Sequence, residues 1–154
     1  MPSLSAEFRY PKNIRFKCSR CTRCCGDTET RIRHVLLFEK EAQSISKDTS
    51  KPLEAFGFRI AGHEPYLYEM KKGKGGKCVF LEGNDCSIYA SRPLICRYYP
   101  FELKTARNKI FLFSPTKECP GIGLGRVLKE SYFRNLFRIA RRLFSQDGYQ
   151  SWTD

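Results

Sequence analysis

Eight cysteines constrain the fold of this 154-residue chain more than any other feature. Four of them fall in one short segment, CSRCTRCC, which runs from Cys18 to Cys25. A disulfide between the adjacent Cys24 and Cys25 would close a very small ring and strain the peptide between them. The N-terminus has no apolar signal segment, so we expect a reducing cytosol, where disulfides are uncommon. Metal coordination is therefore the preferred interpretation, and disulfide pairing is the alternative if the source is a hyperthermophile.

The spacing of these cysteines is typical of metal ligands. A Cys-x-x-Cys step lets the intervening backbone fold around an ion, and residues 18–24 contain this step twice. Three cysteines at this spacing with a distant Cys-Pro are also typical of [4Fe–4S] ligation in ferredoxins, and Cys119-Pro120 would supply the distant member. We predict that all eight cysteines are metal ligands, namely Cys18, Cys21, Cys24, Cys25, Cys78, Cys86, Cys96 and Cys119.

The adjacent pair Cys24 and Cys25 suggests how the ligands divide. Successive side chains of an extended chain point to opposite faces, so the two thiols should serve two neighbouring centres. The predicted groups are Cys18, Cys21, Cys24 and Cys119 in one centre, and Cys25, Cys78, Cys86 and Cys96 in the other. The alternative is one centre that both thiols reach through a bent backbone. We do not expect His34 or His63 to be ligands, because eight thiols already suffice.

The composition and residue patterns predict the fold. Hydrophobic residues make up 41% of the chain and charged residues 29%, which is typical of a globular domain. We predict an α+β fold: a small cysteine-rich, metal-centred domain with short β-hairpins and a C-terminal amphipathic helix. The expected strands are one over 31–38 and two hairpins over 78–89 and 101–113. We also expect a short helix that carries Cys96 after the capping residue Ser91. A glycine-rich turn over 119–125 should then lead into a helix over 126–144. The predicted divisions are a lead-in over 1–17, the metal-binding domain over 18–144 and a loose tail over 145–154.

Six linked elements, taken in order, resemble a known family. They are Cys18-x-x-Cys21-x-x-Cys24-Cys25, Cys78-x-Phe80-Leu81, Cys86-x-Ile88-Tyr89, Arg92-Pro93, Cys96-Arg97 and Tyr99-Pro100-Phe101. The chain resembles, from Cys18 to about Gly125, the CxxCxxCC cysteine-cluster family, a YkgJ-like domain thought to chelate zinc or iron. The family is often described as iron–sulfur oxidoreductase-like, and its domain also occurs in flagellin lysine N-methylases.

The resemblance implies a metal-binding protein and leaves the metal open. The first function that it implies is a redox or cluster-dependent enzyme carrying an iron–sulfur cluster, expected to be [4Fe–4S]. The second is a zinc-stabilised binding module for nucleic acid or an acidic protein, and the third is a part of a lysine N-methylase-like system. No catalytic residue can be named, because the chain has no nucleophile elbow, phosphate loop or paired-carboxylate motif.

Two arginines close to Cys96 are candidate cofactor-binding residues. Arg92 and Arg97 can donate hydrogen bonds to thiolate sulfur or to nearby backbone carbonyls, and their charge would raise the potential of a reducible centre. The alternatives are that Arg92 pairs with Asp85 and that Arg97 is an ordinary surface residue.

The net charge of +12 bears on the partners. A strongly basic surface attracts polyanions, so we expect weak nucleic-acid binding through it. We also expect a redox or protein partner, which the sequence does not identify. No apolar run approaches the ~20 residues needed to span a membrane, so we predict no membrane span and a cytoplasmic location.

Overall fold

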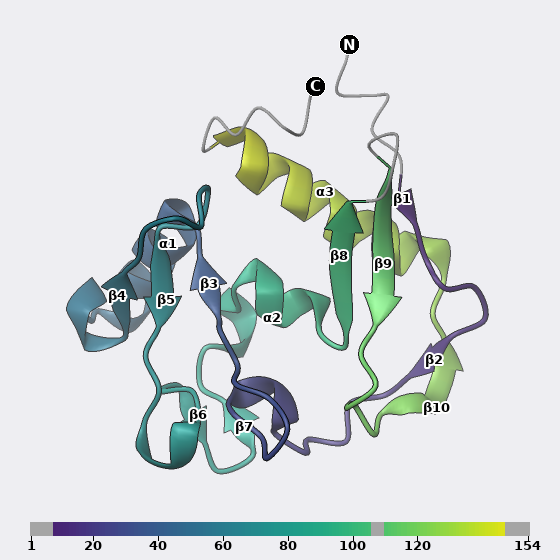
Figure 1. The fold of residues 1–154 in the computed structure, drawn as a ribbon, viewed down its shortest axis with the longest axis horizontal. Helices are drawn as coiled ribbons and strands as arrows, with labels where there is room; N and C mark the ends of the chain where they lie inside the picture. Colours follow the sequence, from purple (N-terminus) through teal and green to yellow (C-terminus); the bar gives the residue numbers. More distant parts are fainter. Residues whose placement is uncertain (1–7, 106–109, 147–154) are drawn as a thin grey trace. The chain divides into compact units, whose positions relative to one another are not determined.

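A computed structural model describes residues 8–105 and 110–146 (Figure 1). The chain divides into two compact units: the terminal unit, residues 1–19 and 98–154, and the central unit, Arg20–Arg97. Each unit combines helices with short strands, which confirms the α+β class. The predicted boundaries after residues 17 and 144 stay predictions, and the tail beyond residue 146 lies outside the described residues.

The terminal unit is built on a three-stranded sheet with the order β1-β9-β8. The predicted hairpin over 101–113 is confirmed as β8 (Phe101–Thr105) and β9 (Phe111–Pro115), which pair antiparallel. The edge strand β1 (Phe8–Arg9) runs parallel to β9. The long helix α3 (Glu130–Gln146) runs across this sheet (Figure 1).

Aromatic rings form the core between α3 and this sheet. Phe133 is fully buried, and its ring centroid lies 5.0 Å from that of Phe101 and 5.3 Å from that of Phe113. One turn further along the helix, Phe137 lies 5.5 Å from Phe111. The buried positions of α3 recur every three or four residues, as an amphipathic helix requires.

A second, two-stranded sheet in the terminal unit corrects the prediction for the glycine-rich segment. Its strands are β2 (Arg15–Phe16) and β10 (Ile122–Val127), so much of the expected turn over 119–125 is strand and the helix begins at Glu130 rather than Arg126. The physical reason lies at Gly121, where a Cβ would stand 2.3 Å from the carbonyl oxygen of Lys17. Glycine here allows two backbones to approach closely, which is a requirement of strand pairing as well as of turns.

The central unit contains a sheet with the order β3-β5-β4 and the helix α1 (Glu39–Thr49). The strands are short: β3 is Leu36–Leu37, β5 is Tyr68–Met70 and β4 is Gly57–Arg59, so the predicted strand over 31–38 is confirmed only near its end. The remaining elements of the unit are 3-10 turns at Arg23–Cys25, Leu53–Ala55, Lys74–Gly76 and Tyr89–Ser91, the hairpin of β6 (Leu81–Glu82) and β7 (Asp85–Cys86), and α2 (Leu94–Tyr98).

The core of the central unit is aliphatic with a few large rings, and it includes Leu37, Ile45, Phe56, Met70 and Phe80. Cys78, Cys86 and Cys96 are partly buried and pack against it, so the fold itself gathers thiols at the margin of an apolar core. None of the helices in the described part of the chain has the length and apolar character that a membrane crossing requires.

Candidate metal centre

The adjacent pair Cys24 and Cys25 lies in a 3-10 turn, Arg23–Cys25, and not in an extended segment. Their Sγ atoms are 3.8 Å apart. The geometric premise of the two-centre division, that the two side chains point to opposite faces, is therefore wrong, because the turn brings both sulfurs to one side. This bent backbone is the feature that the single-centre alternative required.

Backbone hydrogen bonds hold Cys78 beside this turn. The Cys78 N–H donates to the carbonyl of Cys25 (2.5 Å), and the Asp27 N–H donates to the carbonyl of Gly76 (3.0 Å). The two chain segments approach so closely that a Cβ on Gly26 would lie 2.5 Å from the Gly76 oxygen. Gly26, the residue after the Cys24-Cys25 pair, thus lets a thiol from a distant part of the sequence reach the turn.

Cys86 and Cys96 come from the hairpin β6–β7 and from helix α2. Cys86 is opposite Leu81 in the hairpin, whose turn has Gly83 at φ 61°. Helix α2 is anchored to α1 by Glu41, whose carboxylate accepts the N–H groups of both Phe38 (3.1 Å) and Leu94 (2.6 Å). Glu41, and not the predicted Ser91, therefore accepts a hydrogen bond at the start of the helix that carries Cys96.

Five thiols of the central unit act on one another electrostatically, and we call them the five-thiol cluster: Cys24, Cys25, Cys78, Cys86 and Cys96. The hydrogen bond between the Cys24 and Cys25 sulfurs raises the pKa of Cys24 and lowers that of Cys25. Burial raises the pKa of Cys78 and Cys86, and raises that of Cys96 to about 12. Within the five-thiol cluster, Cys25 is thus the thiol most disposed to be a thiolate.

Arg33 is a functional candidate that the sequence analysis missed. Its Nε donates to the carbonyl of Cys24 (3.2 Å), and its positive charge opposes the rise in the pKa of Cys24, Cys78 and Cys96. One feature of the sequence could have indicated Arg33. Arg31 and Arg33 follow the cysteine motif two residues apart, so in an extended chain both cations lie on the same face.

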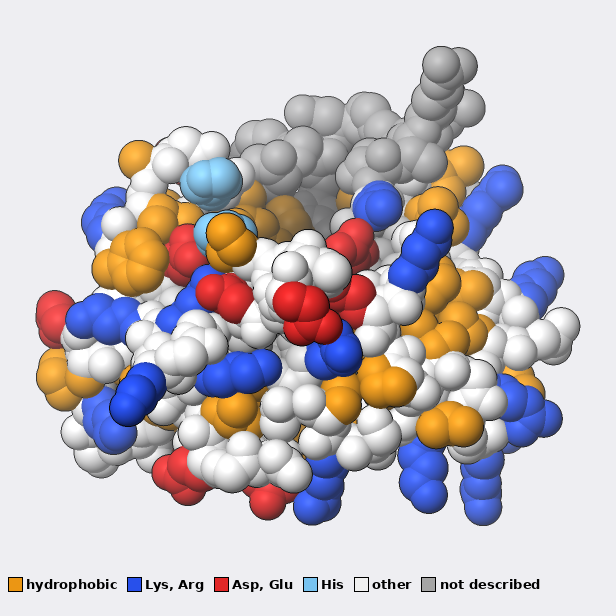
Figure 2. All heavy atoms as spheres, turned by 60° about the horizontal axis from the view of Figure 1, so that its bottom comes forward, with side chains coloured by type: hydrophobic (Ala, Val, Ile, Leu, Met, Phe, Trp, Pro, Cys, Tyr) orange, Lys and Arg blue, Asp and Glu red, His pale blue; other side chains and the backbone are white. Residues whose placement is uncertain are grey.

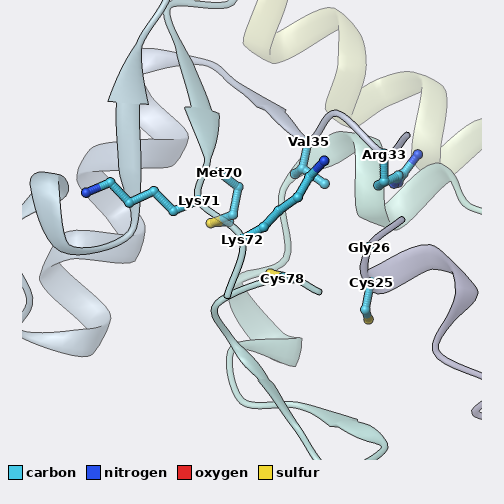
Figure 3. Close-up of a pocket in the computed structure, with 8 residues that line it drawn as sticks. All are labelled: Cys25, Gly26, Arg33, Val35, Met70, Lys71, Lys72 and Cys78. Carbon is cyan, nitrogen blue, oxygen red and sulfur yellow. The ribbon is translucent and has the colours of Figure 1, made fainter. Parts of the chain in front are cut away.

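A small cavity adjoins this arginine. Its volume of about 10 Å³ has room for roughly one water molecule. Cys25, Cys78, Arg33 and Lys72 are among its lining residues, and Figure 3 shows Lys71 pointing away from them. The Lys72 ammonium pairs with Asp27 (2.6 Å), whose carboxylate also accepts the backbone N–H of Arg33 (2.7 Å).

Arg92 lies beside Cys86, and its charge opposes the rise in the pKa of that thiol. Its Nε donates to the Tyr89 carbonyl (3.0 Å), and its guanidinium lies 3.8 Å from the centre of the Tyr89 ring. The alternative pairs Arg92 with Asp85. In the structure, Asp85 pairs with Arg20 instead, at 3.2 Å.

Arg97 donates to two backbone carbonyls, those of Arg92 (2.9 Å) and Ala90 (2.9 Å). It thereby braces the turn that leads into α2. The role of Arg92 and Arg97 at a cofactor stays a prediction.

Three predicted ligands lie outside the five-thiol cluster. Cys18 and Cys119 belong to the terminal unit, where the Lys17 N–H donates to the Gly121 carbonyl (3.1 Å) and holds their chain segments side by side. Cys21 belongs to the central unit and is exposed. His34, also in the central unit, has its Nδ1 2.9 Å from the Glu69 carboxylate.

The donor chemistry of the five-thiol cluster fits a thiophilic metal or an iron–sulfur cluster, since thiolates are the preferred ligands of both. Among residues 8–105 and 110–146, no three cysteine, histidine or carboxylate side chains are arranged so that they could hold one ion as they stand. Coordination would therefore require thiol side chains to rotate and to lose protons.

Comparison with known proteins gives the same assignment. Residues 17–120 match the family model CxxCxxCC, described as "Putative zinc- or iron-chelating domain". The chain is similar to two proteins of Methanocaldococcus jannaschii. Uncharacterized protein MJ0661 is 28% identical over 146 residues, covering 90% of this chain and 76% of the relative. Uncharacterized protein MJ0939 is 26% identical over 124 residues, covering 77% of this chain but only 41% of the relative. No solved structure matches the chain significantly.

Proposed function

The chain belongs to the CxxCxxCC family and is a metal-binding domain of the cysteine-cluster type, and from this premise we propose that it carries an iron–sulfur cluster with a redox role. The observation that supports the proposal best is that five thiols from four separate chain segments of the central unit interact with one another. Four thiolates can hold a [4Fe–4S] cluster, and the fifth thiol lies within hydrogen-bond distance of a ligand sulfur, where it can tune a redox centre.

We assign Cys25, Cys78, Cys86 and Cys96 as ligands of this centre. Cys25 interacts electrostatically with the other three, and four thiolates are the usual ligand set of a [4Fe–4S] cluster. When bound, such a cluster supplies one-electron transfer. Cys24 is within hydrogen-bond distance of the Cys25 sulfur and can donate to it, which would stabilise negative charge on that ligand.

Arg33 and Arg92 would offset part of the negative charge of the thiolates. The positive charge of Arg33 opposes the rise in the pKa of Cys24, and that of Arg92 opposes the rise in the pKa of Cys86. Positive charge near a cluster favours the reduced form and raises the potential. Arg97 would act indirectly, because it holds the backbone on which Arg92 sits.

The remaining cysteines, Cys18, Cys21 and Cys119, stay predicted metal ligands. Cys18 and Cys119 lie on neighbouring segments of the terminal unit, and Cys21 follows Cys18 in the sequence at the Cys-x-x-Cys spacing that is typical of metal ligands.

The alternative is a zinc-stabilised module in which the metal only holds the fold. Four of the five thiols would suffice for tetrahedral zinc, and the half-buried position of all five suits a closed structural site. An iron–sulfur cluster and a zinc ion differ in colour and in sulfide content, so one purified sample can distinguish the two proposals.

The experiment is anaerobic purification of the full chain followed by assays of iron, acid-labile sulfide and zinc. The iron–sulfur proposal expects a brown protein with iron and sulfide in equal amounts and a reversible reduction. Cys78→Ser should lose most of the iron. Val79→Ser is a matched control, since Val79 is adjacent and 40% exposed, and it should keep its iron. A colourless protein with stoichiometric zinc and no sulfide would establish the alternative.

A further inference from the structure

The two-stranded sheet of the terminal unit forms a cationic ribbon, which we define as residues 12–17 and 121–129. Five exposed cations lie on it: Lys12, Arg15, Lys17, Arg126 and Lys129. The two segments contain no aspartate or glutamate. Within the described residues, none of the five cations forms an ion pair, whereas Arg134 on the neighbouring helix pairs with Glu130. Within residues 8–105 and 110–146, the charge of the ribbon is therefore not balanced by an acidic partner.

Apolar side chains project from the middle of this charged surface. Leu124 is 50% exposed and Val127 is 40% exposed. The register of the ribbon shifts between Ile122 and Val127, so the intervening residues bulge out from β2. Gly123 and Gly125, with φ of 94° and 78°, permit this path, and the Arg15 guanidinium donates to the Gly125 carbonyl (2.8 Å). The exposed Leu124 therefore lies in a bulge whose backbone is held by the hydrogen bond from Arg15.

The space-filling view shows the same pattern over the region of β2 and β10. On the right of Figure 2, blue side chains surround exposed orange side chains, and no red side chain lies among them. An isolated exposed leucine needs no explanation, but two exposed aliphatic side chains in a ribbon whose charged residues are all cations give one surface two matching chemical features.

These features favour a lipid surface over a nucleic acid. Nucleic-acid sites combine cations with stacking aromatic rings, but the aromatic residues next to the ribbon are occupied. Tyr10 stacks on Phe133 at 5.0 Å, and Phe16 is half-buried against Gly121. A membrane interface, in contrast, offers anionic phosphate to the cations and acyl chains to aliphatic side chains at the same depth.

We propose that this cationic ribbon binds the surface of a membrane rich in anionic phospholipid, with Leu124 and Val127 entering the headgroup region. The binding is peripheral and reversible, because five cations and two aliphatic side chains give far less affinity than a spanning helix. This would bring a metal-binding protein to a membrane surface, and it does not depend on which metal the protein holds.

The test is co-sedimentation of the full chain with vesicles of phosphatidylcholine alone and of phosphatidylcholine mixed with phosphatidylglycerol. We expect binding only to the anionic vesicles, weakening as salt rises. Arg126→Gln should weaken binding about fivefold, and Leu124→Ser about tenfold. The matched controls are Lys104→Gln and Ile32→Ser, which remove an exposed cation and a 66% exposed apolar side chain outside the ribbon, and both should bind as the unsubstituted protein does.

Metal content and circular dichroism confirm that each variant is folded before its binding is compared. The proposal fails if the anionic vesicles do not retain the protein, or if the control variants lose as much binding as the ribbon variants. A third arm uses duplex DNA and single-stranded RNA of matched phosphate content. Retention by either that needs Arg126 but not Leu124, with no binding to vesicles, would identify the ribbon as a nucleic-acid surface and overturn the proposal.

Discussion

The terminal and central units differ in what can hold them together. The terminal unit has strands of five residues in β8 and β9 and a helix of 17 residues, with the rings of Phe113 and Phe133 fully buried between them. The strands of the central unit are two or three residues long, and cysteines stand at the margin of its core. Apolar burial can stabilise the first unit by itself. We expect the second unit to need an additional stabilising interaction, which a bound metal would supply.

The largest effect should come from removing that interaction. Metal removal or Cys96→Ser should withdraw roughly 10 kcal/mol of metal-dependent folding free energy. Amide hydrogen exchange should then show loss of protection in residues 20–97 while α3, β8 and β9 remain protected. Val79→Ser is the comparison variant, because this side chain is 40% exposed and carries no thiol, so its loss should matter less to folding. Equal loss of protection in both units would show that the two are not independent.

The converse experiment removes a ring from the aromatic core. Phe133→Ala should destabilise the terminal unit by about 3–5 kcal/mol, because it leaves a cavity among Tyr10, Phe101 and Phe113. Denaturant unfolding followed by near-ultraviolet circular dichroism measures this loss. The metal content should not change. Leu112→Ala is the control on the same sheet, because Leu112 is 38% exposed and leaves no buried cavity.

A smaller effect is expected at Arg33. Removing its charge with Arg33→Gln should weaken metal binding about 10- to 100-fold, as is usual for residues that orient and charge-balance ligands. Arg31→Gln is a matched control, because both arginines donate to backbone carbonyls of the same turn. Arg31 donates to the carbonyl of Arg23 (2.9 Å), and Arg33 donates to that of Cys24. Competition with a chelator measures both affinities. If the two variants weaken binding equally, Arg33 acts only as a backbone brace.

The difference between the units also explains how far the sequence could predict the structure. The hairpin of β8 and β9 and the helix α3 follow from the period of their apolar residues, which burial on one face imposes. In the central unit, the local sequence pattern does not predict the structure where contacts between distant residues determine it. The bend at Cys24 and Cys25 depends on how Gly26 meets Gly76, and the start of α2 depends on Glu41, which is 53 residues away from Leu94.

The same limit applies to the site. The cysteine motifs predict the donors, because their spacing is local, and the five-thiol cluster includes all four cysteines of the second predicted centre. The position of Arg33 could not be derived, since it follows from Asp27 accepting the Arg33 N–H and pairing with Lys72. These contacts join residues up to 45 positions apart in the sequence.

The smallest expected effect tests this contact network at Asp27. The Lys72 ammonium and the Arg33 N–H donate to its carboxylate and hold its pKa below the ordinary value. A carboxyl whose pKa is lowered by folding stabilises the protein above its unfolded pKa, and this contribution is lost as pH falls through the lowered folded pKa. Asp27→Asn should therefore reduce the unfolding midpoint of the central unit near neutral pH, and the difference from the unsubstituted protein should shrink in acid. Asp85→Asn is the control, because Asp85 pairs with Arg20 in an exposed ion pair that contributes little. A pH-independent difference for Asp27→Asn would show that the carboxylate acts through its shape and not through its charge.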